Sequence, residues 1–341
     1  MKQSTIEKKK NKKDFGKEKI KILYEDAYLM VILKPSGILS SPYPGSRAKT
    51  VLDIVEHLMR KAGTYSPGHK PFIVHRLDRD TSGVMMLAMT ETSQKKIMDS
   101  WHRMVTERLY RAVAENPLDG TRLPDNGLID SPLAYNSHNI GFVPDSNSKP
   151  SEAALKIKRR STDFPNSGRE KSIYERHLEI KGGKAVFKTV PARTHYRVIE
   201  RGCFHTLFEL SLDTGKKNQI RAHLASLGYP LAGDENYRSK TDPFGRLALH
   251  ARTLEFDHPF TGEHLKFEEP EPSEWIEFVK TKSSFNDVAI WSDKNSQYKR
   301  NKDCNRDLHT FDKYEKSVRI KPSRKKISAM DFIQRGKMGR C

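Results

Sequence analysis

A charged segment between two apolar runs constrains the fold of this chain more than any other feature. The sequence HRLDRDTSG occupies residues 75–83, after the run Phe72–Val74 and before the run Val84–Leu87. Both runs predict β-strands, because they are short, apolar and bounded by polar residues. A segment with so many charges is poorly suited to a hydrophobic core. We therefore expect a loop that leaves one strand, fixes a carboxylate in a cleft and enters the next strand.

The pattern before this loop predicts two strands and a helix. Ile20–Tyr24 and Leu29–Leu33 are apolar runs joined by a polar Glu-Asp turn. Thr50 is a typical N-cap residue, and the apolar residues after it follow helical spacing up to Leu58. This part of the chain is therefore expected to fold as strand, strand and helix.

Later segments predict further strands and only a few helices. Strands are expected at Leu109–Ala114 and Thr206–Leu212, and helices near Thr92–Met104 and Lys217–Leu227, the last ended by Gly228. Because no crossover helices separate the strands, the pattern favours the α+β class over a doubly wound fold. We expect a mixed, largely antiparallel sheet with flanking helices.

The distribution of apolar residues divides the chain into three parts. Residues 20–283 have the pattern of one folded domain, whereas residues 1–19 and 284–341 are polar and basic and are predicted to be disordered. Within the domain, residues 117–192 have few periodic apolar positions. We interpret them as an irregular insertion.

An excess of basic side chains indicates a polyanionic partner. Lys and Arg number 62 against 43 Asp and Glu, which gives a formal net charge of +19. Basic side chains release counterions condensed on phosphates, so nucleic acid is the favoured partner. From charge alone, a basic protein without such a partner is the alternative.

Cysteine spacing and hydropathy exclude several classes of protein. Cys203, Cys304 and Cys341 lie far apart and form no CxxC pair, which argues against a disulfide framework and a zinc site and fits a cytoplasmic protein. No apolar run approaches the ~18 residues of a membrane-spanning helix, and the Lys-rich N-terminus has no signal-peptide core. No membrane partner is expected, and a monomer is the simplest oligomeric state.

The loop HRLDRDTSG resembles the catalytic motif of the RluA family of RNA pseudouridine synthases. The resemblance implies that Asp78 is the essential catalytic residue and that His75 and Arg76 contact RNA. Arg76 would fill the space that a flipped base leaves, and a salt bridge within the loop is its alternative role. Without the motif, Asp78 would be interpreted as an ordinary loop acid.

Two further motifs resemble the same family. In RLYRA, residues 108–112, the resemblance implies that Tyr110 stacks on the target base, and Arg108 stands where the family commonly has Lys. TGKKNQIRAH, residues 214–223, is similar to the family block TGRxHQIRxH. Its Arg, here Arg221, would pair with the catalytic carboxylate and keep it ionised.

The resemblance also implies contacts with RNA or with the target base from the last two motifs and from the closing segment LALHA, residues 247–251. The residues concerned are Arg108, Lys216, Asn218, Gln219 and Leu249. Lys216 and Asn218 stand where the family usually has Arg and His.

The implied fold is a pseudouridine synthase fold with a bent sheet and a central cleft, and the implied substrate is uridine in ribosomal or transfer RNA. The N-glycosidic bond breaks, the base rotates and a C–C bond forms to the same ribose. Because the isomerisation gains and loses no atoms, no cofactor or metal is expected. The sequence also has no P-loop and no metal-ligand spacing. Attack at C1′, attack at base C6 and proton removal at C2′ all stay open as roles for Asp78.

Two other functions are compatible with parts of this pattern. A non-catalytic RNA-binding or ribosome-assembly factor would not need Asp78, Tyr110 and Arg221, yet all three are present. A nucleoside glycosidase would need a second acid to activate water, and Asp80 is the near candidate. The motifs favour the synthase.

Overall fold

The computed structural model describes residues 20–43, 48–117, 119–145, 177–181 and 184–281. The chain divides into one compact unit up to Trp291 and a second from Ser292 onward, and the described residues all belong to the first. The basic arm at residues 1–19 and the tail at 284–341, both predicted from the sequence, lie outside the described residues.

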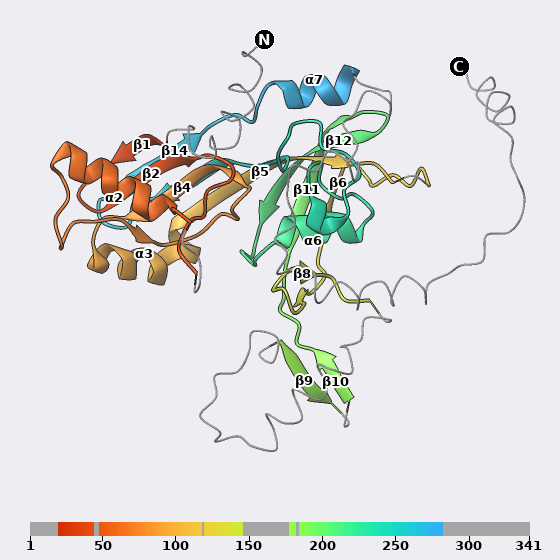
Figure 1. Cartoon of the computed structure of the whole chain (residues 1–341), viewed down its shortest axis with the longest axis horizontal. Coiled ribbons are helices and arrows are strands. Elements are labelled where there is room, and N and C mark those ends of the chain that lie inside the picture. Colours follow the sequence, from red (N-terminus) through yellow and green to blue (C-terminus); the bar gives the residue numbers. More distant parts are fainter. Residues whose placement is uncertain (1–19, 44–47, 118, 146–176, 182–183, 282–341) are drawn as a thin grey trace, which may run out of the picture. The chain divides into compact units, whose positions relative to one another are not determined.

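A ten-stranded sheet forms the centre of the described unit (Figure 1). Its strands are β1 (Lys21–Glu25), β2 (Leu29–Lys34), β3 (Phe72–Ile73), β4 (Ser82–Ala88), β5 (Val105–Glu115), β6 (Asn126–Ile129), β11 (Thr194–Arg201), β12 (His205–Leu212), β13 (Leu249–Asp257) and β14 (His264–Glu268). Their order is β1-β2-β4-β13-β5-β12-β11-β6, with β3 also on β4 and β14 also on β13. Among these strands, β4 and β13 pair in parallel and the other pairs are antiparallel. The predicted α+β class with a largely antiparallel sheet is confirmed.

Helices cover this sheet and flank the residues that the motifs single out. They are α2 (Val51–Ala62), α3 (Glu91–Met104), α6 (Gln219–Ser226) and α7 (Glu274–Thr281), with a 3-10 turn η1 (Glu235–Tyr237). Two hairpins stand apart from the main sheet, β7 (Ala134–Tyr135) with β8 (Gly141–Phe142) and β9 (Leu178–Lys181) with β10 (Lys184–Phe187).

Strand β2 is buried on both faces, which explains its continuous apolar run. Met30 belongs to the same buried cluster as Val55 of α2, whereas Val31 belongs to a second cluster with Ile97 of α3. Successive residues of a strand point to opposite faces, so α2 and α3 cover opposite faces at this end of the sheet (Figure 1). Burying each side chain of this size stabilises the folded state by about 1.5–3 kcal/mol relative to leaving it exposed.

The helix ends follow from local sequence. Thr50 and Asp53 form a capping box at the start of α2, and Gly63 ends it with a φ of 76°. Thr90 caps α3. Helix α6 begins at Gln219, two residues later than the sequence pattern predicts, because Asn218 has a left-handed φ of 56°.

The described part of residues 117–192 contains strands too short for the sequence to show. β6 joins the main sheet by pairing with β11, and the β7–β8 hairpin contacts α6. Strands of two to four residues have too few positions for an alternating pattern. This segment therefore extends the sheet and approaches the helix that carries the TGKKNQIRAH motif.

Candidate functional site

Lys34, the last residue of β2, anchors the loop that carries Asp78. Its side chain is fully buried, and its ammonium donates hydrogen bonds to three carbonyl oxygens, including those of Arg79 at 2.9 Å and Thr81 at 2.7 Å. Burial lowers the pKa of this ammonium to about 7, and the carboxylates of the loop oppose that shift. The end of β2 therefore supports the loop that carries Asp78.

Two serines that follow β2, Ser36 and Ser40, hold the loop at two further points. The hydroxyl of Ser36 donates to the carbonyl of Asp80, and the hydroxyl of Ser40 donates to the carbonyl of Leu77, each at 2.7 Å. The backbone on both sides of Asp78 is thus fixed by side chains that follow β2.

Gly83 marks the point where the loop enters β4 beside β13. It lies opposite Ala251 in the parallel register and has a φ of +127°. An added Cβ would lie 2.2 Å from the carbonyl oxygen of Ala251, so only Gly fits. The neighbouring Ser82 hydroxyl bonds the Nδ1 atom of His250 at 2.7 Å. The TSG end of the motif therefore fixes the exit of the loop.

Two side chains at the start of α6 contact the Asp78 carboxylate. Asn218 donates from Nδ2 to Oδ2 at 2.7 Å, and Arg221 donates from Nη1 to the same oxygen at 3.4 Å. The side chain of Asp78 is 19% exposed. Folding therefore brings Arg221 to Asp78, at a distance that is long for an ion pair, and adds a shorter bond from Asn218.

Arg221 makes its closest contacts with a different carboxylate, Asp234. Its Nε and Nη2 atoms donate to the two oxygens of Asp234 at 2.6 and 2.7 Å, and both side chains are buried. Burial alone would lower the pKa of Arg221, but the hydrogen bonds and charge of Asp234 outweigh it and raise that pKa. The Tyr237 ring lies 5.1 Å from the guanidinium carbon. Arg221 is thus fixed by Asp234 and offers its remaining nitrogen to Asp78.

Asp78 faces a cavity of about 380 Å³ with aromatic walls. Tyr110 from β5 and Leu249 from β13 line it, and both are buried. Burial raises the pKa of the Tyr110 phenol, which Arg108 opposes. Arg108 donates to a backbone carbonyl at 3.0 Å and lies 6.0 Å from the Trp101 ring. The cavity combines one carboxylate, flat rings and a cationic rim.

Three other predicted residues, His75, Arg76 and Lys216, also line this cavity. Arg76 and Lys216 line the cavity and are exposed, and Arg76 makes no ion pair within the described residues. His75 accepts a hydrogen bond from the backbone N–H of Met86 at 2.9 Å, and its ring lies 4.7 Å from that of Trp101. Burial lowers the pKa of His75 to about 3, which keeps it neutral.

The geometry argues against the RNA contact expected of Gln219. Its amide oxygen accepts from the Thr214 hydroxyl at 2.8 Å and from a backbone N–H, and its amide nitrogen donates to the Arg193 carbonyl at 2.9 Å and to a buried Thr hydroxyl. An amide side chain has no further hydrogen-bonding capacity. Gln219 therefore organises the turn before α6.

Sequence reasoning assigned no role to three residues that shape this site. Asp234 pairs with Arg221 from another element, and such a pair has no spacing signature. Trp101 lines the cavity, and a Trp on an otherwise polar helix is a signal that could have found it. Lys217 also lines the cavity, and burial lowers its pKa while Asp78 opposes that shift.

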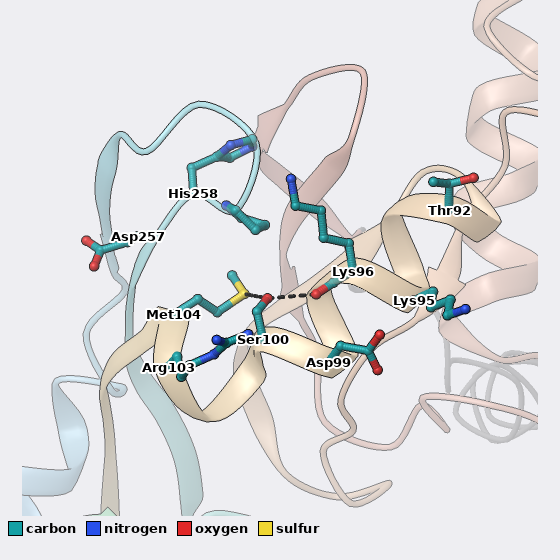
Figure 2. A pocket seen from close by; sticks show the side chains of 10 residues that line it. Thr92, Lys95, Lys96, Asp99, Ser100, Arg103, Met104, Asp257 and His258 are labelled. Atoms are coloured by element: carbon teal, nitrogen blue, oxygen red, sulfur yellow. Dashed lines mark hydrogen bonds between the residues drawn. The ribbon is translucent and has the colours of Figure 1, made fainter.

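A larger hollow of about 650 Å³ lies between α3 and the turn after β13 (Figure 2). Lys95, Lys96 and Arg103 line it, together with Asp99 and Asp257. No residue of the three motifs lines this hollow, and within the part of the chain that the structure describes no buried guanidinium pairs with Asp99 or Asp257. The cavity at Asp78 is therefore the candidate active site.

Residues 28–226 match the family model described as RNA pseudouridylate synthase. The chain belongs to the RNA pseudouridylate synthase family. It is 32% identical over 261 residues to an uncharacterized RNA pseudouridine synthase of Bacillus subtilis, covering 76% of this chain and 71% of that protein. It is 33% identical over 264 residues to the ribosomal large subunit pseudouridine synthase D of Nitrosomonas europaea, covering 75% and 63%. The resemblance to the RluA family is confirmed, and the enzyme class is isomerase.

The solved structure of human RNA pseudouridylate synthase domain containing 4 has the same fold. The TM-score is 0.52 at 21% sequence identity, over 75% of this chain and 90% of that one. This confirms the predicted pseudouridine synthase fold. Within the described residues, no helix of this synthase is long and apolar enough to cross a membrane.

Proposed function

We propose that this pseudouridine synthase isomerises specific uridines of ribosomal RNA, with Asp78 as the catalytic carboxylate. The choice of ribosomal over transfer RNA is supported by relatives named ribosomal large subunit pseudouridine synthase D, from Nitrosomonas europaea and Pseudomonas aeruginosa among others. The chain spans 63% and 70% of the lengths of these two relatives.

The observation that carries the proposal is the state of the Asp78 carboxylate. Asn218 and Arg221 both bond Oδ2, and no described residue donates a hydrogen bond to Oδ1. Oδ1 is therefore free to act on the ribose or the base while Oδ2 is held. A carboxylate that is held through one oxygen and partly exposed in a cavity suits catalysis better than a structural ion pair does.

The reaction needs a flipped uridine in this cavity. The N1–C1′ bond breaks, the uracil turns and a C5–C1′ bond forms, while the proton of C5 leaves and N1 gains one. Stacking on Tyr110 returns ~1–3 kcal/mol of the cost of flipping. Arg76, Arg108 and Lys216 at the rim suit contacts with phosphates, which supply affinity rather than sequence selectivity.

Tritium release from RNA labelled with 5-³H-uridine tests the proposal, because isomerisation expels the hydrogen of C5. We expect release from unmodified ribosomal RNA with the wild type, none with Asp78→Ala, and near-normal release with Asp80→Ala. Asp80 is a matched control, since it lies in the same loop and its exposed carboxylate pairs with Arg79.

Three outcomes would contradict the proposal. Undiminished release by Asp78→Ala would remove Asp78 as the catalytic group. Tritium release from transfer RNA but not from ribosomal RNA would show that transfer RNA is the substrate. Absence of release from both RNAs would leave RNA binding without isomerisation.

A further inference from the structure

We propose that Asn218 is a positioning residue that aims the Asp78 carboxylate, and that Gly141 of the β7–β8 hairpin sets the orientation of its amide. This inference rests on the proposed catalytic role of Asp78. It gives the hairpin, which lies outside the three motifs, a part in the active site.

Asn218 makes the shorter of the two bonds that hold Asp78. Its Nδ2 atom is 2.7 Å from Oδ2, against 3.4 Å for the nitrogen of Arg221. The guanidinium is already engaged with Asp234 through two short bonds. The direction of the Asp78 carboxylate is therefore set mainly by a neutral amide, and no described residue donates a hydrogen bond to its Oδ1 atom.

Asn218 occupies the N-cap position of α6, but its side chain does not cap the helix. Asn at the N-cap of a helix usually accepts a hydrogen bond from the first turn. Asn218 precedes α6 with a φ of 56° and makes no such bond. Asn tolerates the left-handed region better than most residues. Asn thus meets two needs here, a left-handed backbone and an amide donor aimed at Asp78.

Gly141 and Asp78 together allow one orientation of the Asn218 amide. The backbone N–H of Gly141 lies 3.5 Å from Oδ1 of Asn218, a long contact. A carboxylate accepts hydrogen bonds and a backbone N–H donates them. Rotating the amide by half a turn would set oxygen against the Asp78 oxygen and NH₂ against the N–H of Gly141. Both neighbours therefore select the observed orientation.

Gly141 reaches this position because it has no side chain. An added Cβ would lie 2.9 Å from the carbonyl oxygen of Lys217. The Tyr237 hydroxyl donates a short hydrogen bond to the carbonyl of Gly141. The hairpin backbone is thus held on one side by the turn before α6 and on the other by the residue beside Arg221.

Several ionisable groups face Asp78, and the amide of Asn218 is neutral among them. These groups are Lys34 from β2, Tyr110 from β5, Tyr135 from β7, Lys217 and Arg221 at α6, and Asp234 and Tyr237 at η1. Replacing Asn218 by Asp adds a negative charge to this set at the position of the donor.

The first test is Asn218→Asp, which keeps the shape of the side chain. Loss of a hydrogen bond to a charged group should lower kcat by about 10- to 100-fold, with KM within about threefold. The acid limb of the kcat profile should move to higher pH, because a second carboxylate disfavours ionisation of the first. Asn139→Asp is the matched control. Asn139 also has a left-handed φ, of 58°, but it lies in the β7–β8 hairpin and has no hydrogen bond to Asp78 among the described residues.

A second readout does not depend on turnover. The carboxyl ¹³C signal of Asp78, identified by its loss in Asp78→Asn, should titrate at higher pH in Asn218→Asp and Asn218→Ala than in the wild type. Gly141→Ala should lower kcat without changing KM. Thermal unfolding of each variant checks that it folds.

The two proposals fail separately. If the wild type releases no tritium but the ¹³C titration moves in the Asn218 variants, the proposed function fails and the positioning contact stands. If the wild type is active and the Asn218 variants keep its kcat, acid limb and ¹³C titration, the positioning role is overturned. An unchanged kcat in Gly141→Ala removes Gly141 from the proposal.

Discussion

Arg221 bonds both oxygens of Asp234 at 2.6 and 2.7 Å, whereas its contact with Asp78 is a single bond of 3.4 Å. The two carboxylates therefore have different tasks. Asp234 compensates the buried guanidinium charge, which would otherwise be costly. Asp78 receives part of the same positive field without being locked into a bidentate pair.

Asp234→Asn should destabilise the fold by about 3 kcal/mol, because it leaves a buried guanidinium with a weaker partner. Urea unfolding measures the change. Asp213→Asn is the control, since Asp213 is 42% exposed in its pair with Arg193 and should cost less than about 1 kcal/mol. Equal losses in the two variants would show that burial of the Arg221 pair does not matter.

Gly83→Ala should prevent stable folding or cost more than about 4 kcal/mol, because the new Cβ would overlap the backbone of β13. Gly63→Ala is the matched control. It has a φ of 76° with nothing within 4 Å of the added Cβ, and it should cost about 1–2 kcal/mol. Soluble yield and melting temperature report both variants. Similar melting temperatures would contradict the close approach of β4 to β13.

The free energy of unfolding should decrease as the pH is lowered below neutrality, because His205 is buried. Burial lowers the pKa of His205 to about 4, and its side chain is 2% exposed. An unfolded His titrates near pH 6.5, so between about pH 6.5 and 4 the unfolded chain binds more protons than the native state. Protonation of this group in the unfolded chain therefore lowers the free energy of unfolding by about 3 kcal/mol as the pH falls through that window.

Urea unfolding between pH 4.5 and 7.5 checks this with His205→Gln, which can still bond the Thr241 hydroxyl. The variant should show a flatter dependence than the wild type. His264→Gln is the control, because hydrogen bonding to Asp257 raises the pKa of exposed His264, so its contribution has the opposite sign. A slope that His205→Gln leaves unchanged would contradict the assignment.

Basic residues on α3 should contribute to RNA affinity. Lys95, Lys96 and Arg103 of α3 line the hollow between this helix and the turn after β13, and the same helix supplies Trp101 to the cavity at Asp78 (Figure 2). Their combined change to Ala should weaken RNA binding, leave kcat unchanged and lower the slope of log K against log salt by about one for each phosphate that is no longer neutralised. Changing Lys61 on α2 to Ala should leave the slope as it is. Identical slopes would exclude the α3 surface from the RNA interface.

The sequence predicts the elements whose pattern is dictated by burial. β2 and β4 are covered on both faces and so have unbroken apolar runs, and α2 has one buried face with Thr50 as its cap. The loop around Asp78 is predictable for the opposite reason, because so many charges fit only a surface cleft. β6 could not be found, since four residues at a sheet edge require no particular pattern.

Side-chain roles are less predictable than elements. Asn218 and Gln219 are adjacent in the same motif, yet the first bonds Asp78 and the second bonds the turn before α6. A motif indicates that polar groups gather at one place. It does not say whether each polar atom faces the cavity or the protein, because that depends on local backbone geometry such as the left-handed φ of Asn218.

The residues that meet at Asp78 are far apart in the sequence. Asp78 precedes Asn218 by 140 residues and Arg221 by 143. Contacts this distant carry a large loop-closure entropy and form late in folding. A nascent chain that has emerged only through residue 217 already carries the complete HRLDRDTSG loop but neither partner of its carboxylate. A chain that ends before Asn218 therefore lacks both donors that hold the Asp78 carboxylate, so this site is complete only after the start of α6 has packed against the loop.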